Sequence, residues 1–173
     1  MEIRQIESTD EEALERFLRR VPEGDRTFFK EDVDDPAVVA AWTRPGGARA
    51  VAVDGAEVVG YVAVVPQHGW SSHVGEIRVI VDPEHRGRGI GRDLGRRGVL
   101  EAVQLGLRKM VVEVVADQEA TIAMFRSLGF DPEALLTNHV RDRAGELRDL
   151  MVLAQSVDEQ WSSMAMAGIA NEV

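Results

Sequence analysis

The chain has 173 residues, no cysteine and a formal net charge of −10, with 45% hydrophobic and 29% charged residues. This length suits one domain with its own core, and the lack of cysteine excludes disulfides, thiol nucleophiles and cysteine-based zinc sites. The acidic balance argues against a nucleic-acid-binding protein, because phosphate backbones reward Lys and Arg spread over a whole face. We expect a cytoplasmic protein without membrane contact, because the sequence has neither a leader-type apolar stretch nor the roughly 18 apolar residues of a membrane span.

The first half of the chain predicts a strand, two helices and a hairpin. Residues 1–7 alternate between apolar and polar side chains like a strand, and Thr9 or Asp10 can cap the helix that follows. A second short helix begins after Asp35, with Pro36 in its first turn. Next comes a predicted hairpin, with strands over 48–53 and 57–65 and a turn at Asp54 and Gly55.

The second half predicts strands and helices in alternation. The expected elements are a strand over 74–81, a helix over about 91–107, a strand over 109–115, a helix ending at Leu128, and strands near 135–141 and 147–154. The first of these strands is rich in apolar residues, which is typical of a strand inside a sheet. Asp117 is predicted to cap the helix that ends at Leu128, and Gly129 to end it. This order of elements predicts an α/β fold with a mixed sheet.

The domain organisation is predicted to be simple. No repeat, low-complexity tract or linker divides the sequence, so residues 1–155 are expected to form one domain. Residues 156–173 form a predicted amphipathic helical tail that carries Trp161, Met164 and Ile169. These side chains either pack on their own domain or form the subunit interface of a homodimer.

The sequence HRGRGIGRDLGRR, residues 85–97, concentrates basic charge in an otherwise acidic chain. Residues 86–97 hold five Arg and one Asp, a net charge of +4, which leaves −14 for the rest. Glycine permits a backbone to approach a bulky anion without a Cβ clash, and the N–H groups at a helix N-terminus attract negative charge. A strand, this loop and a helix in succession therefore predict a site for a pyrophosphate or another polyphosphate.

Two common nucleotide-binding patterns do not fit this loop. The Walker A pattern requires Gly-Lys-Ser/Thr, and the sequence has no such triplet. The dinucleotide fingerprint G-x-G-x-x-G fails because Arg92 or Leu94 stands where its last glycine belongs. A loop that merely turns is the remaining alternative. Farther along the predicted helix, Gly95 and Gly98 cost helix stability, which indicates that the helix lies close against the sheet.

The segment RGRGIG, residues 86–91, resembles the R/Q-x-x-G-x-G/A motif of the GNAT superfamily of acyl-CoA-dependent N-acetyltransferases. The longer segment VIVDPEHRGRGIG is similar to the central motif of that family, and AMFRSLGF, residues 123–130, is similar to its A-x-Y-x-x-x-G-F pattern. The resemblance covers most of the chain. It implies a mixed, mostly antiparallel sheet flanked by helices and splayed between the strands over 74–81 and 109–115, with acyl-CoA in the cleft.

The resemblance also implies which residues bind coenzyme A. Backbone groups of the strand before the loop would pair with the pantetheine arm, and the loop would cradle the pyrophosphate. Gln118 stands where the family commonly has an Asn that reaches the cofactor, and Phe125 where it commonly has the Tyr that protonates the departing sulfur. No metal is expected. The expected acetyl-CoA-binding residues are Val79, Ile80, Val81, Arg86, Gly87, Arg88, Gly89, Ile90, Gly91, Arg92, Gln118 and Phe125.

Acetyl transfer to an amine requires a general base, because an alkylammonium with a pKa of about 10.4 is almost wholly protonated at pH 7. Glu76 is the first candidate, since several branches of the family use a Glu at this place; the alternative is a strand carboxylate paired with Arg78. Glu113, in the facing strand, is the competitor, and His73 is a weaker candidate. Water or Tyr61, the single tyrosine of the sequence, would protonate the leaving thiolate.

The predicted function is that of an N-acetyltransferase, in which a primary amine directly attacks acetyl-CoA or a related acyl-CoA. The alternative is an acyl-CoA-binding sensor that has lost turnover, which the missing hydroxyl at Phe125 favours. The acceptor stays open between two classes. One is a cationic amine, such as a polyamine, a lysine side chain or a protein N-terminus; the other is an amino acid whose carboxylate Arg26, Lys30 or Arg141 would hold.

Overall fold

The computed structural model describes residues 1–26, 29–44 and 47–157. Within these residues, seven strands form one sheet in the order β1-β2-β3-β4-β5-β7-β6. Neighbouring strands are antiparallel except β4 and β5, which run parallel. The strands are β1 (Glu2–Gln5), β2 (Arg49–Asp54), β3 (Glu57–Pro66), β4 (Val74–Val81), β5 (Lys109–Val115), β6 (Asp131–Arg141) and β7 (Leu147–Ser156). The α-helices are α1 (Glu11–Arg20), α2 (Glu23–Arg26), α3 (Pro36–Trp42), α4 (Ile90–Gln104) and α5 (Glu119–Ser127).

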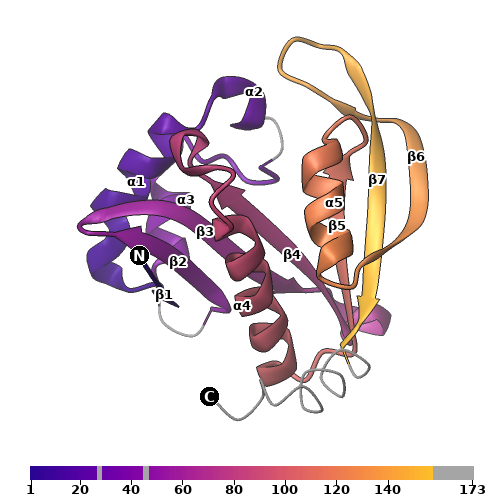
Figure 1. The fold of residues 1–173 in the computed structure, drawn as a ribbon, viewed down its shortest axis with the longest axis horizontal. Helices are drawn as coiled ribbons and strands as arrows, with labels where there is room; N and C mark the ends of the chain where they lie inside the picture. Colours follow the sequence, from indigo (N-terminus) through magenta and orange to yellow (C-terminus); the bar gives the residue numbers. More distant parts are fainter. Residues whose placement is uncertain (27–28, 45–46, 158–173) are drawn as a thin grey trace.

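Helices cover both faces of this sheet (Figure 1). On one face, α4 packs across β2, β3 and β4 and contacts α5, around a core that includes Leu94, Phe125 and Leu153. On the other face, α1 and α3 cover β2 and β3 around Phe17 and Trp42. The prediction of a mixed, mostly antiparallel sheet flanked by helices is therefore confirmed.

Helix α1 forms where the apolar spacing predicts it, with Leu14 and Phe17 fully buried on one side. Asp10, one of the two predicted caps, is the N-cap residue of α1, but its side chain accepts no hydrogen bond from the first turn of this helix. The Asp10 carboxylate accepts two hydrogen bonds from the Arg4 guanidinium, both of 2.7 Å, and one from the Glu7 N–H at 2.8 Å. The first strand and the first helix are thus joined by a hydrogen-bonded ion pair, which is stronger than a neutral hydrogen bond.

The starts of α3 and α5 differ in how they are capped. The Asp35 carboxylate caps α3 by accepting a hydrogen bond from the Ala37 N–H at 2.9 Å. The predicted cap of α5 is wrong, because its N-cap residue is Gln118, and the Asp117 carboxylate instead pairs with Arg148 at 3.0 Å. The N-cap residue of α5 therefore carries an amide, and this side chain makes no hydrogen bond to the first turn of the helix.

Gly98 lets α4 lie directly on the sheet, as predicted. A Cβ at Gly98 would collide with Ile77 of β4 and come within 3.2 Å of Val62 of β3. For Gly95 the predicted partner is wrong, because a Cβ there would collide with Leu128, just after α5, and not with a strand. One glycine brings α4 close to the sheet, and the other brings it close to the end of α5.

Some element boundaries differ from the predictions. The charged segment after α1 contains the short helix α2, whose four residues are too few to show an apolar periodicity. Helix α4 begins at Ile90, one residue before the predicted start, and ends at Gln104, three residues before the predicted end. Strand β6 begins at Asp131 rather than near residue 135. Ser156, the first residue of the predicted tail, is instead the last residue of β7, and the tail from residue 158 onward lies outside the described residues.

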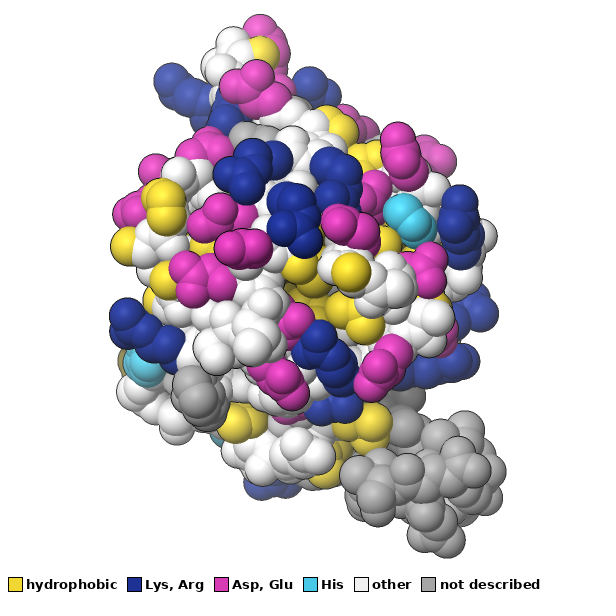
Figure 2. Space-filling view, turned by 90° about the vertical axis from the view of Figure 1, so that its left-hand side faces the viewer, with side chains coloured by type: hydrophobic (Ala, Val, Ile, Leu, Met, Phe, Trp, Pro, Cys, Tyr) yellow, Lys and Arg dark blue, Asp and Glu magenta, His cyan; other side chains and the backbone are white. Residues whose placement is uncertain are grey.

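Charged side chains of both signs are interspersed over the face shown in Figure 2. Near the β2–β3 hairpin, for example, Arg16 and Arg20 of α1 both reach Glu57, at 3.6 and 3.1 Å. In the part of the chain that the structure describes, no helix is long and apolar enough to cross a membrane.

Candidate active site

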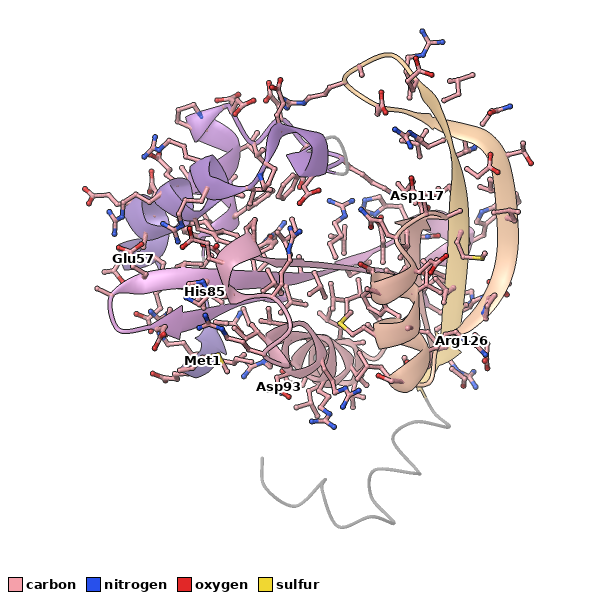
Figure 3. All side chains as sticks on the ribbon, turned by 45° about the horizontal axis from the view of Figure 1, so that its top comes forward. Met1, Glu57, His85, Asp93, Asp117 and Arg126 are labelled. Carbon is pink, nitrogen blue, oxygen red and sulfur yellow. The ribbon has the colours of Figure 1, made fainter. Side chains whose placement is uncertain are left out.

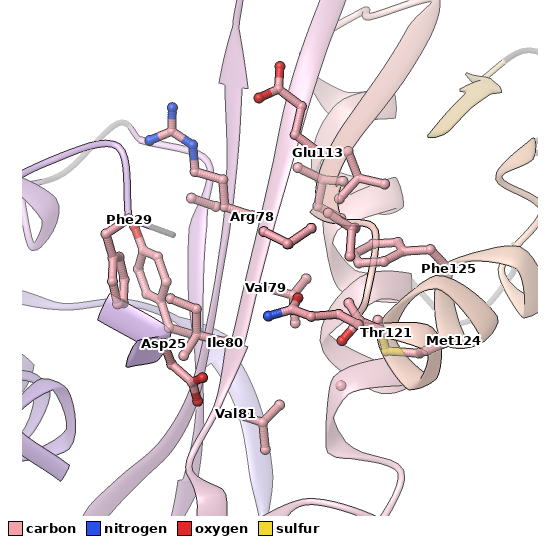
Figure 4. Close-up of a pocket in the computed structure, with 18 of the residues that line it drawn as sticks. Asp25, Phe29, Arg78, Val79, Ile80, Val81, Glu113, Thr121, Met124 and Phe125 are labelled. Atoms are coloured by element: carbon pink, nitrogen blue, oxygen red, sulfur yellow. The ribbon is translucent and has the colours of Figure 1, made fainter. Parts of the chain in front are cut away.

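Strands β4 and β5 part from one another in the middle of the sheet. They pair only from Val74 to Glu76 of β4 and from Lys109 to Val111 of β5. Beyond this point β4 stays paired with β3, and β5 stays paired with β7. The divergence opens a cleft of about 1200 Å³ between β4 and α5 (Figure 4). On the side facing this cleft, the backbone of Val79–Val81 has an edge that no strand of the described residues pairs with.

The loop between β4 and α4 forms one end of the cleft. Gly87 and Gly89 have positive φ angles of 75° and 85°, a conformation that only glycine adopts without strain. A Cβ at either position would meet nothing within 4 Å, so both backbones border open space. Gly89 is the N-cap residue of α4, and the first N–H groups of the helix follow it. The loop therefore presents backbone N–H groups and a positive helix end to an anion.

Asp82 holds the start of this loop in place. Its carboxylate accepts a hydrogen bond from Arg20 Nε at 2.7 Å and one from the Glu84 N–H at 3.0 Å. Burial raises the pKa of Asp82, but the hydrogen bonds from Arg20 and the Glu84 N–H more than offset this effect and leave the pKa below its usual value. His85 Nδ1, at 3.7 Å from the Asp82 carboxylate, is buried and has no hydrogen-bond partner among the described residues.

The cleft collects nearly all the residues predicted to bind the cofactor, since residues 79–81, 86, 87, 89–92, 118 and 125 line it. Arg88 is the exception, because it does not line the cleft and its guanidinium donates to the Glu84 carbonyl at 3.2 Å. Arg86 pairs with Asp25 of α2 at 2.6 Å. His85 and Asp117 lie on opposite sides of the opening (Figure 3). The roles of these residues remain predictions, whereas their common location is a property of the fold.

A cluster of charged side chains occupies the place where β4 and β5 part. Lys30, from the segment between α2 and α3, lies 3.0 Å from Glu76 Oε1 and 2.8 Å from Glu113 Oε2, measured from Nζ. Arg78 Nε and Nη2 donate to the two oxygens of Glu76 at 3.1 and 3.2 Å, and Arg78 Nη1 donates to Glu31 at 3.2 Å. Both predicted base candidates therefore converge on a single ammonium group. Glu76 also has the Arg78 partner that the alternative interpretation expects.

The charges of this cluster stabilise one another. Burial raises the pKa of Glu76, but hydrogen bonds from Arg78 and Lys30 more than offset it and leave the pKa lowered. Burial lowers the pKa of Lys30, but hydrogen bonds to Glu113 and Glu76 outweigh it and leave the pKa raised. Glu76 is thus a carboxylate and Lys30 an ammonium at neutral pH. His73, the weaker candidate base, does not line the cleft.

An aromatic wall borders the charged cluster, and the sequence alone does not predict it. The rings of Phe29 and Trp42 stack with centroids 6.2 Å apart, and those of Trp42 and Tyr61 at 4.9 Å. All three residues line the cleft. The signal available in the sequence is Phe29 itself, an aromatic residue within a highly charged segment. Its partners come from α3 and β3, so only the folded chain brings the wall together.

Phe125, at the place of the family's tyrosine, and Tyr61, a candidate proton donor to the sulfur, lie in different surroundings. Phe125 of α5 is 2% exposed and packs edge-on against Phe130 with centroids 5.3 Å apart. The Tyr61 hydroxyl accepts a hydrogen bond from Arg49 Nε at 3.1 Å. Burial raises the pKa of Tyr61 far above its usual value, with Arg49 opposing the effect. Tyr61 is therefore a weak acid despite its position in the lining of the cleft.

The parted parallel strands and the glycine loop at the start of α4 define the fold class of acyl-CoA-dependent acetyltransferases. Comparison with known families agrees, because the model of the acetyltransferase (GNAT) family matches residues 6–130. The chain belongs to this family. The resemblance inferred from the motifs is thereby confirmed.

Several known proteins are similar to the chain. A mycothiol acetyltransferase of Kocuria rhizophila is 39% identical over 72 residues, which are 41% of this chain and 24% of that protein. The chain thus spans about a quarter of the length of this relative. The crystal structure of a ribosomal-protein-alanine N-acetyltransferase from Brucella melitensis has a TM-score of 0.80 at 26% identity, covering 90% of this chain and 99% of that one. A putative acetyltransferase from Salmonella typhimurium, solved with its cofactor acetyl-CoA, has a TM-score of 0.76 at 25% identity, covering 91% of this chain and 94% of that one.

Proposed function

We propose that this protein transfers an acetyl group from acetyl-CoA to a primary amine. The observation that carries the proposal is the convergence of Glu76 and Glu113 on one ammonium group at the point where β4 and β5 part. Two carboxylates on facing strands would hold an acceptor ammonium there, beside the unpaired backbone edge of β4. Family membership supports the reaction class.

The cleft has the features that acetyl-CoA requires. The backbone edge of Val79–Val81 can pair with the amide groups of the pantetheine arm in the manner of an added strand. Gly87 and Gly89 leave room beside the N-terminus of α4 for a pyrophosphate, and Arg86 and Arg92 line the same end of the cleft. When bound, acetyl-CoA supplies an activated acyl thioester.

Glu76 is proposed as the general base. It is ionised at neutral pH, and its Oε1 lies 3.0 Å from Lys30 Nζ, so it is placed to accept a proton from an ammonium held at that position. Such a base contributes about 10²- to 10⁴-fold in rate. Glu113, whose side chain is 32% exposed, is the competing base and otherwise helps to hold the ammonium. Water remains the proposed proton donor to the thiolate, because Tyr61 is too weak an acid.

The acceptor class extends to amines that carry a second charged group. Arg49, Arg78 and Glu31 line the cleft beside the aromatic wall and can pair with a carboxylate or an ammonium of the acceptor. Two of the similar proteins are named a mycothiol acetyltransferase and a ribosomal-protein-alanine N-acetyltransferase. A small amine and a protein N-terminus are therefore both proposed as candidates here.

The test is the release of coenzyme A thiol from acetyl-CoA with a panel of primary amines. We expect release with at least one amine, and a loss of about 10²-fold in kcat for Glu76→Gln with acetyl-CoA affinity unchanged. Glu113→Gln is the matched variant on the facing strand. A larger kcat loss for Glu113→Gln than for Glu76→Gln would transfer the role of base to Glu113.

A non-catalytic acyl-CoA sensor is the second candidate function. Phe125 favours it, because this position in the lining of the cleft carries no hydroxyl. In that case the protein would bind acetyl-CoA tightly and release no thiol with any amine, and Glu76→Gln would change neither property. A titration with acetyl-CoA, together with the thiol-release assay, therefore separates the two functions.

A further inference from the structure

Lys30 is one of very few primary amines in the chain. The sequence has 20 Lys and Arg residues, and only Lys30 and Lys109 among them are lysine. Guanidinium groups stay protonated in proteins and are poor nucleophiles, whereas a lysine amine can be acylated. Lys30 therefore places one of the few acylatable amines of the chain inside the cleft.

The Lys30 amine lies where the proposed acceptor amine would lie. Its Nζ is within 3.0 Å of carboxylate oxygens of both Glu76 and Glu113, which come from the two strands that part. The side chain is 42% exposed and belongs to a segment between helices, so it reaches the two carboxylates from outside the strands that carry them. Phe29, Glu31 and Lys30 all line this cleft.

We propose that Lys30 is a self-acetylation site, acetylated by the acetyl-CoA bound in the same cleft when no acceptor is present. The inference rests on the proposed function, because it uses the same donor and the same base. It adds a covalent modification of a residue that would otherwise compete with the acceptor ammonium for Glu76 and Glu113.

The reaction balances with the groups in the cleft. The Lys30 ammonium gives one proton to Glu76, and its neutral amine attacks the thioester carbonyl. A C–N bond forms, the C–S bond breaks, and the electron pair leaves with sulfur. The second amine proton, lost as the amide forms, passes through water to the thiolate, which departs as coenzyme A thiol, and Glu76 releases the first proton to solvent. The product is an N-acetyl-lysine without positive charge, so Glu113 loses its ion-pair partner and Glu76 keeps Arg78.

The test measures the mass of the intact protein and of its peptides after incubation with acetyl-CoA alone. We expect the mass of one acetyl group to be added at Lys30, at a first-order rate that does not depend on protein concentration. Lys109 is the matched control, because it pairs with a single carboxylate, Glu133, at 2.6 Å and does not line the cleft. We expect Lys30→Arg to abolish the added mass, Lys109→Arg to keep it, and Glu76→Gln to slow it by about 10²-fold.

The outcomes separate this inference from the proposed function. Thiol release with an added amine but no acetyl group on Lys30 overturns the inference and leaves the function standing. Equal acetylation of Lys30 and Lys109, or a Lys30 rate unchanged in both Glu76→Gln and Glu113→Gln, also overturns it, because non-specific chemical acetylation would explain either result. Acetylation of Lys30 alone, with no thiol release for any added amine, supports the inference and contradicts transfer to an external acceptor. No acetylation and no thiol release contradicts both.

Discussion

Replacing Gly89 with alanine should weaken acetyl-CoA binding far more than it weakens the fold. Gly89 has φ 85°, precedes α4 and lines the cleft. A Cβ there meets no protein atom within 4 Å, so the methyl group would extend into the space offered to the ligand. The two effects have different magnitudes and can be measured separately.

The stability cost follows from the backbone angle. An alanine in the left-handed region costs about 1–2 kcal/mol, and the lower entropy of the unfolded chain returns about 0.4–1 kcal/mol. The net loss of about 1 kcal/mol should lower the Tm by roughly 2–4 °C for a chain of this length. The affinity loss should be larger, because a methyl that lengthens a charge-assisted hydrogen bond removes about 1.5–3 kcal/mol, or roughly 10- to 150-fold in Kd.

Gly106 is the matched control for this substitution. It also has a positive φ, 68°, and a Cβ there also meets nothing within 4 Å, but the residue does not line the cleft. Thermal unfolding should show similar Tm losses for Gly89→Ala and Gly106→Ala. Calorimetric titration with acetyl-CoA should show a weakened Kd for Gly89→Ala alone. Equal acetyl-CoA affinities in the two variants would falsify the assignment of the loop as the pyrophosphate site.

Two further substitutions test the surroundings of the cleft. Asp82→Asn should lower the free energy of unfolding by about 2 kcal/mol at pH 7, since it removes a charge-assisted hydrogen bond to Arg20. Because the folded-state pKa of Asp82 is lowered, its contribution to stability is complete above the usual pKa of 3.8 and is lost as the pH falls below that value. Urea unfolding should therefore show that the free energies of unfolding of the wild type and Asp82→Asn converge in acid. A difference in stability that persists in acid contradicts the ion pair. Phe125→Tyr should leave acetyl-CoA affinity unchanged in the calorimetric titration. It should lower the Tm slightly, because the added hydroxyl is buried and needs a hydrogen-bond partner. A large loss of affinity would mean that Phe125 contacts the cofactor differently from the expectation.

The elements that carry the donor site could be predicted from the sequence because their signals are local. The apolar runs over Val74–Val81 and Lys109–Val115 define strands with the predicted bounds. The glycines between them permit positive φ angles that few other residues adopt. Even the close packing at Gly98 follows from the cost of glycine within a helix. Local conformational preference and apolar periodicity thus suffice for the strands, the loop and the helix after it.

The acceptor side of the cleft could not be predicted in the same way. Lys30 follows a helix too short to leave a periodic pattern, and its partners Glu76 and Glu113 lie on strands far along the chain. Likewise, Asp117 looks like a helix cap in the sequence but pairs with Arg148 of β7. A carboxylate can either cap a nearby helix or pair with a distant cation. Which of the two it does depends on which segments the fold brings together.

The sequence by itself therefore determined the fold class and the loop suited to the donor, because these depend on short-range backbone preferences, and its motifs indicated the family by resemblance. The tertiary structure decided which charges meet in the cleft. Strands β4 and β5 part after Glu76, and the gap between them is where Lys30 reaches both carboxylates. That convergence arises from the divergence of two paired strands, and no local property of either strand specifies it.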